Sequence, residues 1–130
     1  MLSTHGYPAV HGNLLVVEDD ADFAPLLKEV LVMAGYDVQL ARSVAEAKAG
    51  IAAAPVVAAI LDWSLLGGSA HEIADLLKRA RVPYVFASGA NPTDLPSGHR
   101  WAPFFAKPFP ITALINAVEQ ARSTGVPAEA

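Results

Sequence analysis

The chain has 130 residues, long enough for one domain with a hydrophobic core and too short for two of ordinary size. It contains no cysteine, which excludes disulfide scaffolds, thiolate metal sites and thiol nucleophiles, and its net charge of −4 is opposite in sign to that of a typical nucleic-acid-binding surface. Hydrophobic residues make up 53% and charged residues 17% of the chain, a composition typical of a packed globular protein.

No segment is predicted to cross a membrane. The longest apolar stretch, Ile51–Leu61, is interrupted by Pro55 and is much shorter than the roughly 20 residues that a span requires. Residues 1–13 contain no Lys or Arg and no apolar run, so they do not resemble a secretory signal, and we expect a cytoplasmic protein. The composition predicts a loose N-terminal arm over residues 1–12, one domain over 13–124 and a tail over 125–130.

Five short segments are predicted to be β-strands. Leu14–Val17 and Val56–Leu61 are apolar on both faces, as is typical of parallel strands that are covered by helices on both sides. The other three predicted strands are Asp37–Ala41, Val82–Ala87 and Pro103–Ala106.

Amphipathic segments are predicted to be helices. Pro25 is tolerated in the first turn of the first helix, and Gly35 is a natural stop after it. Ser43 and Glu46 form a capping-box pattern that opens the second helix. The residues whose spacing predicts burial are Phe23, Leu26, Leu27, Val30 and Leu31 in the first helix, Val44, Ala47 and Ile51 in the second, Ile73, Leu76, Leu77 and Ala80 in the third, and Ile111, Leu114, Ile115 and Val118 in the last.

The connection from Ser88 to Trp101 is the exception in this alternation of strands and helices. It contains two prolines and two glycines, which favour a loop with at most one helical turn. The pattern as a whole predicts an α/β domain with a doubly wound, five-stranded parallel sheet, in which the helix between the fourth and fifth strands is shortened or replaced by a loop.

Polar residues follow four of the predicted strands, at the edge of the sheet where ligands bind in such folds. They are Glu18, Asp19 and Asp20 after the first strand, Asp62 after the third, Ser88 after the fourth and Lys107 after the fifth. Carboxylates gathered at one edge repel one another unless a divalent cation joins them, and Mg²⁺ prefers carboxylate, water and phosphate oxygens. With a lysine and a hydroxyl nearby, the arrangement suggests attack of the Asp62 carboxylate on phosphorus to give an aspartyl phosphate.

Each of these residues has a simpler interpretation when it is taken alone. Asp20 is also a candidate N-cap of the first helix, and Ser88 is a common turn former. Asp62 and Lys107 are of types that often lie in exposed loops. The joint placement at four separate strand ends favours a site over these interpretations. The sequence also contains no GxGxxG or GxxxxGK[ST] loop that could cradle a nucleotide phosphate.

Two histidines and two tryptophans stand outside this set. His71 and His99 are interpreted as surface or capping residues. Trp63 and Trp101 either frame the mouth of the site or pack in the core or a loop; the sequence leaves both interpretations open.

Four segments resemble the receiver domain of response regulators in two-component signalling, and the resemblance spans about residues 13–123. They are LLVVEDD (Leu14–Asp20), ILDWSLLGG (Ile60–Gly68), PYVFASG (Pro83–Gly89) and FFAKPF (Phe104–Phe109). The loop after Asp62 lacks the Met-Pro-Gly common in receivers. Two segments, PYVFASG and LPSG, look more like those of single-domain receivers with an FATG-type motif. In this chain Ser88 takes the place of the threonine of that motif. The resemblance implies a flavodoxin-like strand order of 2-1-3-4-5.

The resemblance also implies a role for each matched residue. Asp62 would be the phosphoacceptor, and Mg²⁺ would be bound by Glu18, Asp19, Asp62 and the backbone carbonyl of Ser64. The phosphoryl oxygens would be contacted by Ser88 and Lys107. The switch residues would be Ser88 and Phe104, and Pro108 would follow a cis peptide bond.

The function implied is that of a single-domain response regulator, a signalling domain that assists its own phosphorylation and dephosphorylation but is not an enzyme in the ordinary sense. It would accept a phosphoryl group from a sensor histidine kinase or a histidine phosphotransfer protein, and would signal by protein contact or phosphate flow as a monomer or weak homodimer. An alternative is a pseudo-receiver that acts as an adaptor without phosphorylation. A small hydrolase is less favoured, because Asp62 is followed by Trp63 and Ser64 and no Asp-x-Asp arrangement is present.

Overall fold

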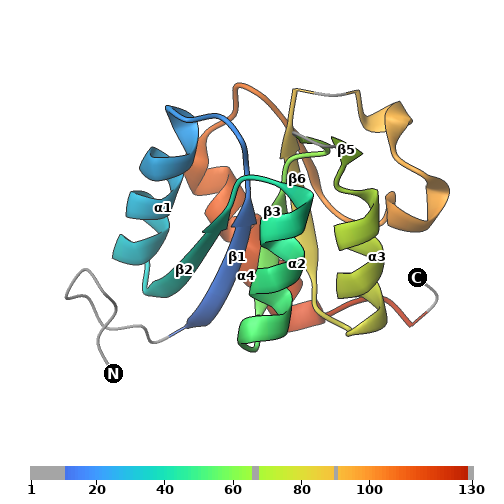
Figure 1. Ribbon diagram of the computed structural model, residues 1–130, viewed down its shortest axis with the longest axis horizontal. Helices are drawn as coiled ribbons and strands as arrows, with labels where there is room; N and C mark the ends of the chain where they lie inside the picture. Colours follow the sequence, from blue (N-terminus) through green and yellow to red (C-terminus); the bar gives the residue numbers. More distant parts are fainter. Residues whose placement is uncertain (1–10, 66–67, 90, 129–130) are drawn as a thin grey trace.

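The structure, a computed structural model, describes residues 11–65, 68–89 and 91–128 (Figure 1). Five parallel strands form one sheet in the order β2-β1-β3-β6-β7, and β4 pairs with β5 in a small antiparallel hairpin. The strands are β1 (Gly12–Val17), β2 (Tyr36–Ala41), β3 (Ala58–Leu61), β4 (Ser64–Leu65), β5 (Gly68–Ser69), β6 (Tyr84–Ser88) and β7 (Phe104–Ala106). The helices are α1 (Phe23–Met33), α2 (Val44–Ala53), α3 (His71–Arg79) and α4 (Ile111–Thr124). Because β6 and β7 are the fourth and fifth strands of the large sheet, the predicted fold class and strand order are confirmed.

Residues 1–10 and 129–130 lie outside the described residues, and they include most of the predicted N-terminal arm and the end of the predicted tail. The domain boundaries therefore remain predictions. Just after α4, Val126 is buried and its carbonyl accepts a hydrogen bond from Arg81 Nη2 at 2.7 Å. Among the described helices, none combines the length and the apolarity that crossing a bilayer requires.

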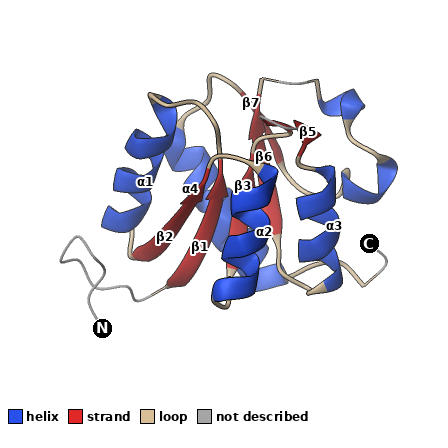
Figure 2. Ribbon diagram, in the orientation of Figure 1, coloured by secondary structure: helices blue, strands red, loops and turns tan. Residues whose placement is uncertain are grey.

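Helices cover both faces of the large sheet, with α1 and α4 on one face and α2 and α3 on the other (Figures 1 and 2). Successive residues of β1 explain how both faces are filled, because side chains alternate along a strand. Leu14 and Val16 pack in the core beneath α1 and α4, whereas Leu15 and Val17 pack in the core beneath α2 and α3. A strand with an apolar residue at every position is therefore buried on both sides, as the sequence predicted.

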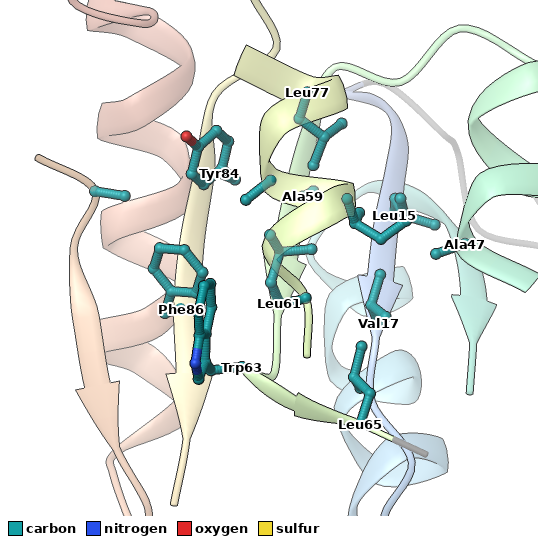
Figure 3. Close-up of a cluster of buried hydrophobic side chains, with 14 of the residues drawn as sticks. Leu15, Val17, Ala47, Ala59, Leu61, Trp63, Leu65, Leu77, Tyr84 and Phe86 are labelled. Carbon is teal, nitrogen blue, oxygen red and sulfur yellow. The ribbon is translucent and has the colours of Figure 1, made fainter. Parts of the chain in front are cut away.

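Figure 3 shows the core beneath α2 and α3. Trp63 belongs to this core: it is only 9% exposed, and its ring packs edge-on against Phe86 with 5.8 Å between centroids. Trp101 is half-buried beside the same core, with its ring 4.8 Å from that of Tyr84. Of the two interpretations that the sequence left open for the tryptophans, packing describes both side chains.

Two residues that the helical spacing placed in the core are exposed. Leu26 is 53% exposed, because the buried stripe of α1 runs along Ala24, Leu27 and Leu31 and Leu26 lies beside it. Ala80 follows the end of α3 and is exposed, whereas Ala74 within the helix is buried.

The start of α2 follows the predicted capping pattern in part. Ser43 Oγ accepts a hydrogen bond from the backbone N–H of Glu46 at 3.1 Å. The Glu46 carboxylate accepts from the backbone N–H of Arg42 at 3.0 Å, one residue before the position that a capping box would use.

The connection between β6 and β7 contains two short 3₁₀ turns, Pro92–Asp94 and Ser97–His99, and no α-helix among its described residues. The predicted loss of a regular helix is confirmed, although the sequence predicted one helical turn at most. Asn91 caps the first turn by accepting from the backbone N–H of Thr93 at 3.0 Å. The Lys107–Pro108 peptide bond after β7 is cis, as the resemblance implied.

Candidate functional site

The register of the sheet brings four strand ends to one place. Val17 at the end of β1 lies opposite Leu61 at the end of β3, and Ser88 at the end of β6 lies opposite Ala106 in β7. Backbone hydrogen bonds then extend the ladders by one residue. They are Glu18 N–H to Ala41 O at 2.9 Å, Asp62 N–H to Val17 O at 2.9 Å and Lys107 N–H to Ser88 O at 3.0 Å. The residues that follow these strands are therefore tied to the sheet by backbone hydrogen bonds.

The carboxylates of Glu18, Asp19 and Asp62 form what we call the acidic cluster. One carboxylate oxygen from each residue lies within 4.8 Å of the others. Glu18 is 2% exposed and Asp62 is 6% exposed, so two of these charged groups are almost fully removed from water. Burial of that kind is costly unless charge and hydrogen bonds compensate it.

Lys107 supplies the positive charge. Its Nζ donates to Glu18 Oε1 at 2.5 Å and to Asp62 Oδ2 at 3.2 Å, so one ammonium bridges two carboxylates. Burial alone would lower the pKa of Lys107, but the hydrogen bonds to Glu18 and Asp62 and the charges of both carboxylates together outweigh it and raise that pKa. Lysine 107 is therefore held in its charged form at neutral pH.

The pKa of Glu18 is also raised, but for a carboxyl group this disfavours the charged form. Its burial raises the pKa of the carboxyl group, and the charge of Asp62 adds to this effect, whereas the hydrogen bonds from Lys107 and from the backbone of Asp20 oppose it. A raised carboxyl pKa means that the folded protein resists the negative charge at this position. A further cation at the cluster would relieve that cost.

Asp62 is also fixed by donors on its other oxygen. Ser88 is fully buried, and its Oγ donates to Asp62 Oδ1 at 2.7 Å. The backbone N–H of Ser64 donates to the same oxygen at 3.2 Å. One carboxylate oxygen thus faces a hydroxyl and an amide, and the other faces an ammonium, which leaves Asp62 little rotational freedom.

Asp20 has a different role from its two acidic neighbours. Its Oδ1 accepts from the backbone N–H groups of Asp22 at 2.9 Å and Phe23 at 3.0 Å, at the start of α1. These hydrogen bonds, the one from Phe23 above all, lower the pKa of Asp20. Asp20 therefore satisfies two backbone N–H groups at the start of α1, although Asp22, and not Asp20 as predicted, is the N-cap residue of this helix.

The acidic cluster fits a divalent cation. Three carboxylates and one ammonium carry formal charges of −3 and +1, which leaves −2 at a largely buried site. Carboxylate oxygens are the ligands that Mg²⁺ and Ca²⁺ prefer, and a charge of +2 balances the surplus. The described residues around the cluster offer no thiolate ligand, since the chain has no cysteine.

Phe104 and His99 both lie outside the acidic cluster. Phe104, the predicted switch aromatic, is half-buried in β7 with its ring 6.2 Å from that of Phe86. The interpretation of His99 as a surface or capping residue is wrong, because its side chain is buried between Tyr84 and Asp75. The loop that carries His99 has no periodicity and no motif from which its burial could be predicted. The available signal is its position three residues after Pro96, in a segment that must turn back to β7.

Comparison with known proteins yields no matching family model. Among curated proteins, the chain is similar to the photosynthetic apparatus regulatory protein RegA of Cereibacter sphaeroides, with 33% identity over 69 residues. This match covers 53% of the chain and 38% of RegA, so it spans well under half of that protein's length.

Solved structures match over most of the chain. The non-phosphorylated HemR receiver domain from Leptospira biflexa is 25% identical with a TM-score of 0.74, covering 86% of this chain and 94% of that one. A response regulator from Burkholderia pseudomallei, solved with a phosphorylated aspartic acid, calcium ion and citrate, is 22% identical with a TM-score of 0.73, covering 87% of this chain and 69% of that one. The chain therefore has the receiver-domain fold of response regulators.

Proposed function

We propose that the chain is a phosphoacceptor receiver in which Asp62 takes a phosphoryl group from a phosphohistidine in the presence of Mg²⁺. The observation that carries this proposal is the environment of Asp62. Its carboxylate is buried next to those of Glu18 and Asp19, with the Lys107 ammonium on one oxygen and the Ser88 hydroxyl on the other. A nucleophile, a cation site and two donors for phosphoryl oxygens are then within one cluster.

The transfer itself breaks one bond and forms one. An oxygen of the Asp62 carboxylate attacks phosphorus, and the bond between phosphorus and the histidine nitrogen breaks with its electron pair left on that nitrogen. The product is an acyl phosphate on Asp62 and a histidine that is free to take a proton. Bound Mg²⁺ would neutralise charge on the phosphoryl oxygens, and its ligands would be Glu18, Asp19, Asp62 and the backbone carbonyl of Ser64.

Ser88 and Lys107 would respond to the new group. Both donate to Asp62 before transfer, and after transfer the negative oxygens near them belong to phosphate, to which charge-assisted hydrogen bonds are strong. Ser88 ends β6 and leads into the connection to β7, so a shift of its hydroxyl would move that loop. Phe104 in β7 would act as the switch aromatic that follows this movement.

The wider setting is part of the same proposal. The donor would be a sensor histidine kinase or a histidine phosphotransfer protein in the cytoplasm, and the domain would signal by protein contact or phosphate flow as a monomer or weak homodimer. The phosphorylated aspartic acid and the calcium ion in the Burkholderia pseudomallei response regulator support this chemistry on the same fold. The regulatory role of RegA, which the chain matches in part, supports a signalling function.

The test is incubation of the chain with acetyl phosphate or phosphoramidate and Mg²⁺, followed by intact-mass measurement. We expect an adduct of one phosphoryl group in the wild type and in Asp94→Asn, an exposed acid in the connection between β6 and β7. Asp62→Asn should give no adduct. No adduct on the wild type with either donor would contradict the proposal and favour the adaptor function, and turnover of a phosphate ester would favour a hydrolase.

A further inference from the structure

A second polar cluster lies away from the acidic cluster, between α3 and the connection from β6 to β7. We call His71, Asp75 and His99 the histidine cluster. His71 and Asp75 are on α3, and His99 ends the second 3₁₀ turn. Figure 1 shows this connection, in yellow and orange, beside α3. None of the three residues takes part in the function proposed above.

The three side chains converge on a small volume. His99 Nε2 is 2.7 Å from Asp75 Oδ1, and His71 Nε2 is 3.5 Å from Asp75 Oδ2. One ligand atom from each of the three residues lies within 4.8 Å of the others. His71 and Asp75 are four residues apart on a helix and so share one face, and the loop adds the third group from the opposite side. Two imidazoles and a carboxylate form a common ligand set for zinc and related divalent transition metals.

His99 is positioned as metal-bound histidines usually are, with its second ring nitrogen engaged by a partner. Its Nδ1 is 2.7 Å from the hydroxyl oxygen of Tyr84, a fully buried residue in β6. The pKa of His99 is lowered, above all by burial and also by the charges of His71 and Lys78, although Asp75 opposes the shift. The neutral imidazole, which is the form that binds metals, is thereby favoured.

An ion would reach the cluster from solvent. The side chain of His71 is 49% exposed and that of Asp75 is 45% exposed, whereas that of His99 is 3% exposed and forms the inner wall. Trp63 shields one side, with its ring 5.8 Å from that of His71. Lys78 of α3 is a nearby cation whose charge opposes metal binding, and its ammonium donates to the carbonyl of Gly98 at 3.2 Å.

We propose that His71, Asp75 and His99 bind one divalent transition-metal ion of the Zn²⁺ type, with water completing the coordination. Without metal, the acceptor-only carboxylate of Asp75 requires the proton of His99 on Nε2, and Nδ1 accepts from Tyr84. On binding, the Nε2 lone pair goes to the metal, the ring proton moves to Nδ1, and the hydroxyl proton of Tyr84 turns away from the ring so that the Tyr84 oxygen accepts from Nδ1. The bound ion joins α3 to the connection between β6 and β7.

The test is calorimetric titration of ZnCl₂ into the full chain without an affinity tag, with excess Mg²⁺ present to occupy the acidic cluster. We expect one saturable Zn²⁺ per chain, with affinity weakened about tenfold or more by either His71→Gln or Asp75→Asn. Both residues are half-exposed, so these variants should fold, and circular dichroism checks this. The matched control is His5→Gln combined with His11→Gln, which should leave the affinity unchanged.

A second readout locates the ion. In ¹⁵N spectra of the histidine side chains, Zn²⁺ should shift the Nε2 signals of His71 and His99 and change the tautomer of His99. The proposal is overturned if no saturable binding occurs, if both single variants bind as tightly as the wild type, or if the His5 and His11 control abolishes binding.

Discussion

The acidic cluster and the histidine cluster differ in what holds their buried groups. Glu18, Asp62 and Lys107 each follow a strand directly, and backbone hydrogen bonds of the sheet fix them. His99 comes from a loop: its backbone is hydrogen-bonded to Pro96 and Ala102 of the same loop, and its side chain is held by Tyr84 and Asp75. The first cluster balances buried charge with an ammonium, and the second keeps the buried ring neutral.

This difference has a consequence for stability. Removing a charge from the acidic cluster leaves an opposite charge buried without compensation, which is among the most costly of single changes. Removing a group from the histidine cluster leaves a neutral polar group without a partner, at a smaller cost. Single substitutions in the two clusters test this contrast.

The largest effect is expected for Lys107→Met. Without the ammonium, Glu18 and Asp62 repel each other in a buried site, and we expect a loss of about 2 kcal/mol in the free energy of unfolding, less than for a fully buried pair because Lys107 is partly exposed. Mg²⁺ should stabilise the variant more than the wild type, because it replaces the missing positive charge. Urea denaturation with and without Mg²⁺ measures both effects.

Lys48→Met is the matched control for that change. Lys48 pairs with Glu72 at 2.7 Å, but both side chains are about half exposed, at 51% and 52%. An exposed pair contributes roughly 0–1 kcal/mol, so this variant should lose little stability and respond to Mg²⁺ as the wild type does. Equal losses in the two variants would show that burial does not set the cost in the acidic cluster.

A smaller effect is expected for Ser88→Ala. The variant loses the hydrogen bond to Asp62 Oδ1, but that oxygen keeps the N–H of Ser64, so the loss should be about 1 kcal/mol. Phosphoryl incorporation from acetyl phosphate should also slow several-fold. Ser88→Thr keeps the hydroxyl and should restore the incorporation rate; if Ser88→Thr behaves like Ser88→Ala, the hydroxyl is not the functional group.

The smallest effect is a pH dependence from the histidine cluster. The pKa of His99 is lower in the folded chain than the ordinary value of 6.5, mainly because of burial. The unfolded chain therefore binds more protons as the pH falls below 6.5, and the folded state loses stability over that range. The groups that face the ring are Asp75, His71, Lys78 and Tyr84.

Melting temperatures between pH 7.5 and pH 5, measured with a chelator present, should fall more steeply for the wild type than for His99→Gln. Parallel curves would contradict this.

The sequence predicted the acidic cluster because the fold makes strand ends meet. Once Leu14–Val17 and Val56–Leu61 are strands of one parallel sheet, the residues after them lie at one edge, whatever the details of packing. The order of the strands came from the resemblance and not from periodicity. The lysine between two carboxylates is a detail of side-chain geometry that no pattern showed.

The sequence could not predict the histidine cluster for a physical reason. His99 lies in a connection with no helical or strand period, and its burial depends on where that connection folds back against α3. The hairpin of Ser64–Leu65 and Gly68–Ser69 was missed as well, since two-residue strands carry no period. The prediction was also wrong at Leu26 in the regular helix α1, because the whole of a wide apolar stripe was assigned to the core.

The most direct test of the central claim measures the initial rate of phosphoryl incorporation into Asp62 against Mg²⁺ concentration, in the wild type and in Asp19→Asn. Asp19 contributes a carboxylate to the cluster without being the nucleophile. We predict a saturable dependence on Mg²⁺ in the wild type, and a curve moved to about tenfold higher concentration or more in the variant. A rate that does not depend on Mg²⁺, or one that Asp19→Asn leaves unchanged, would contradict a cation held by the acidic cluster.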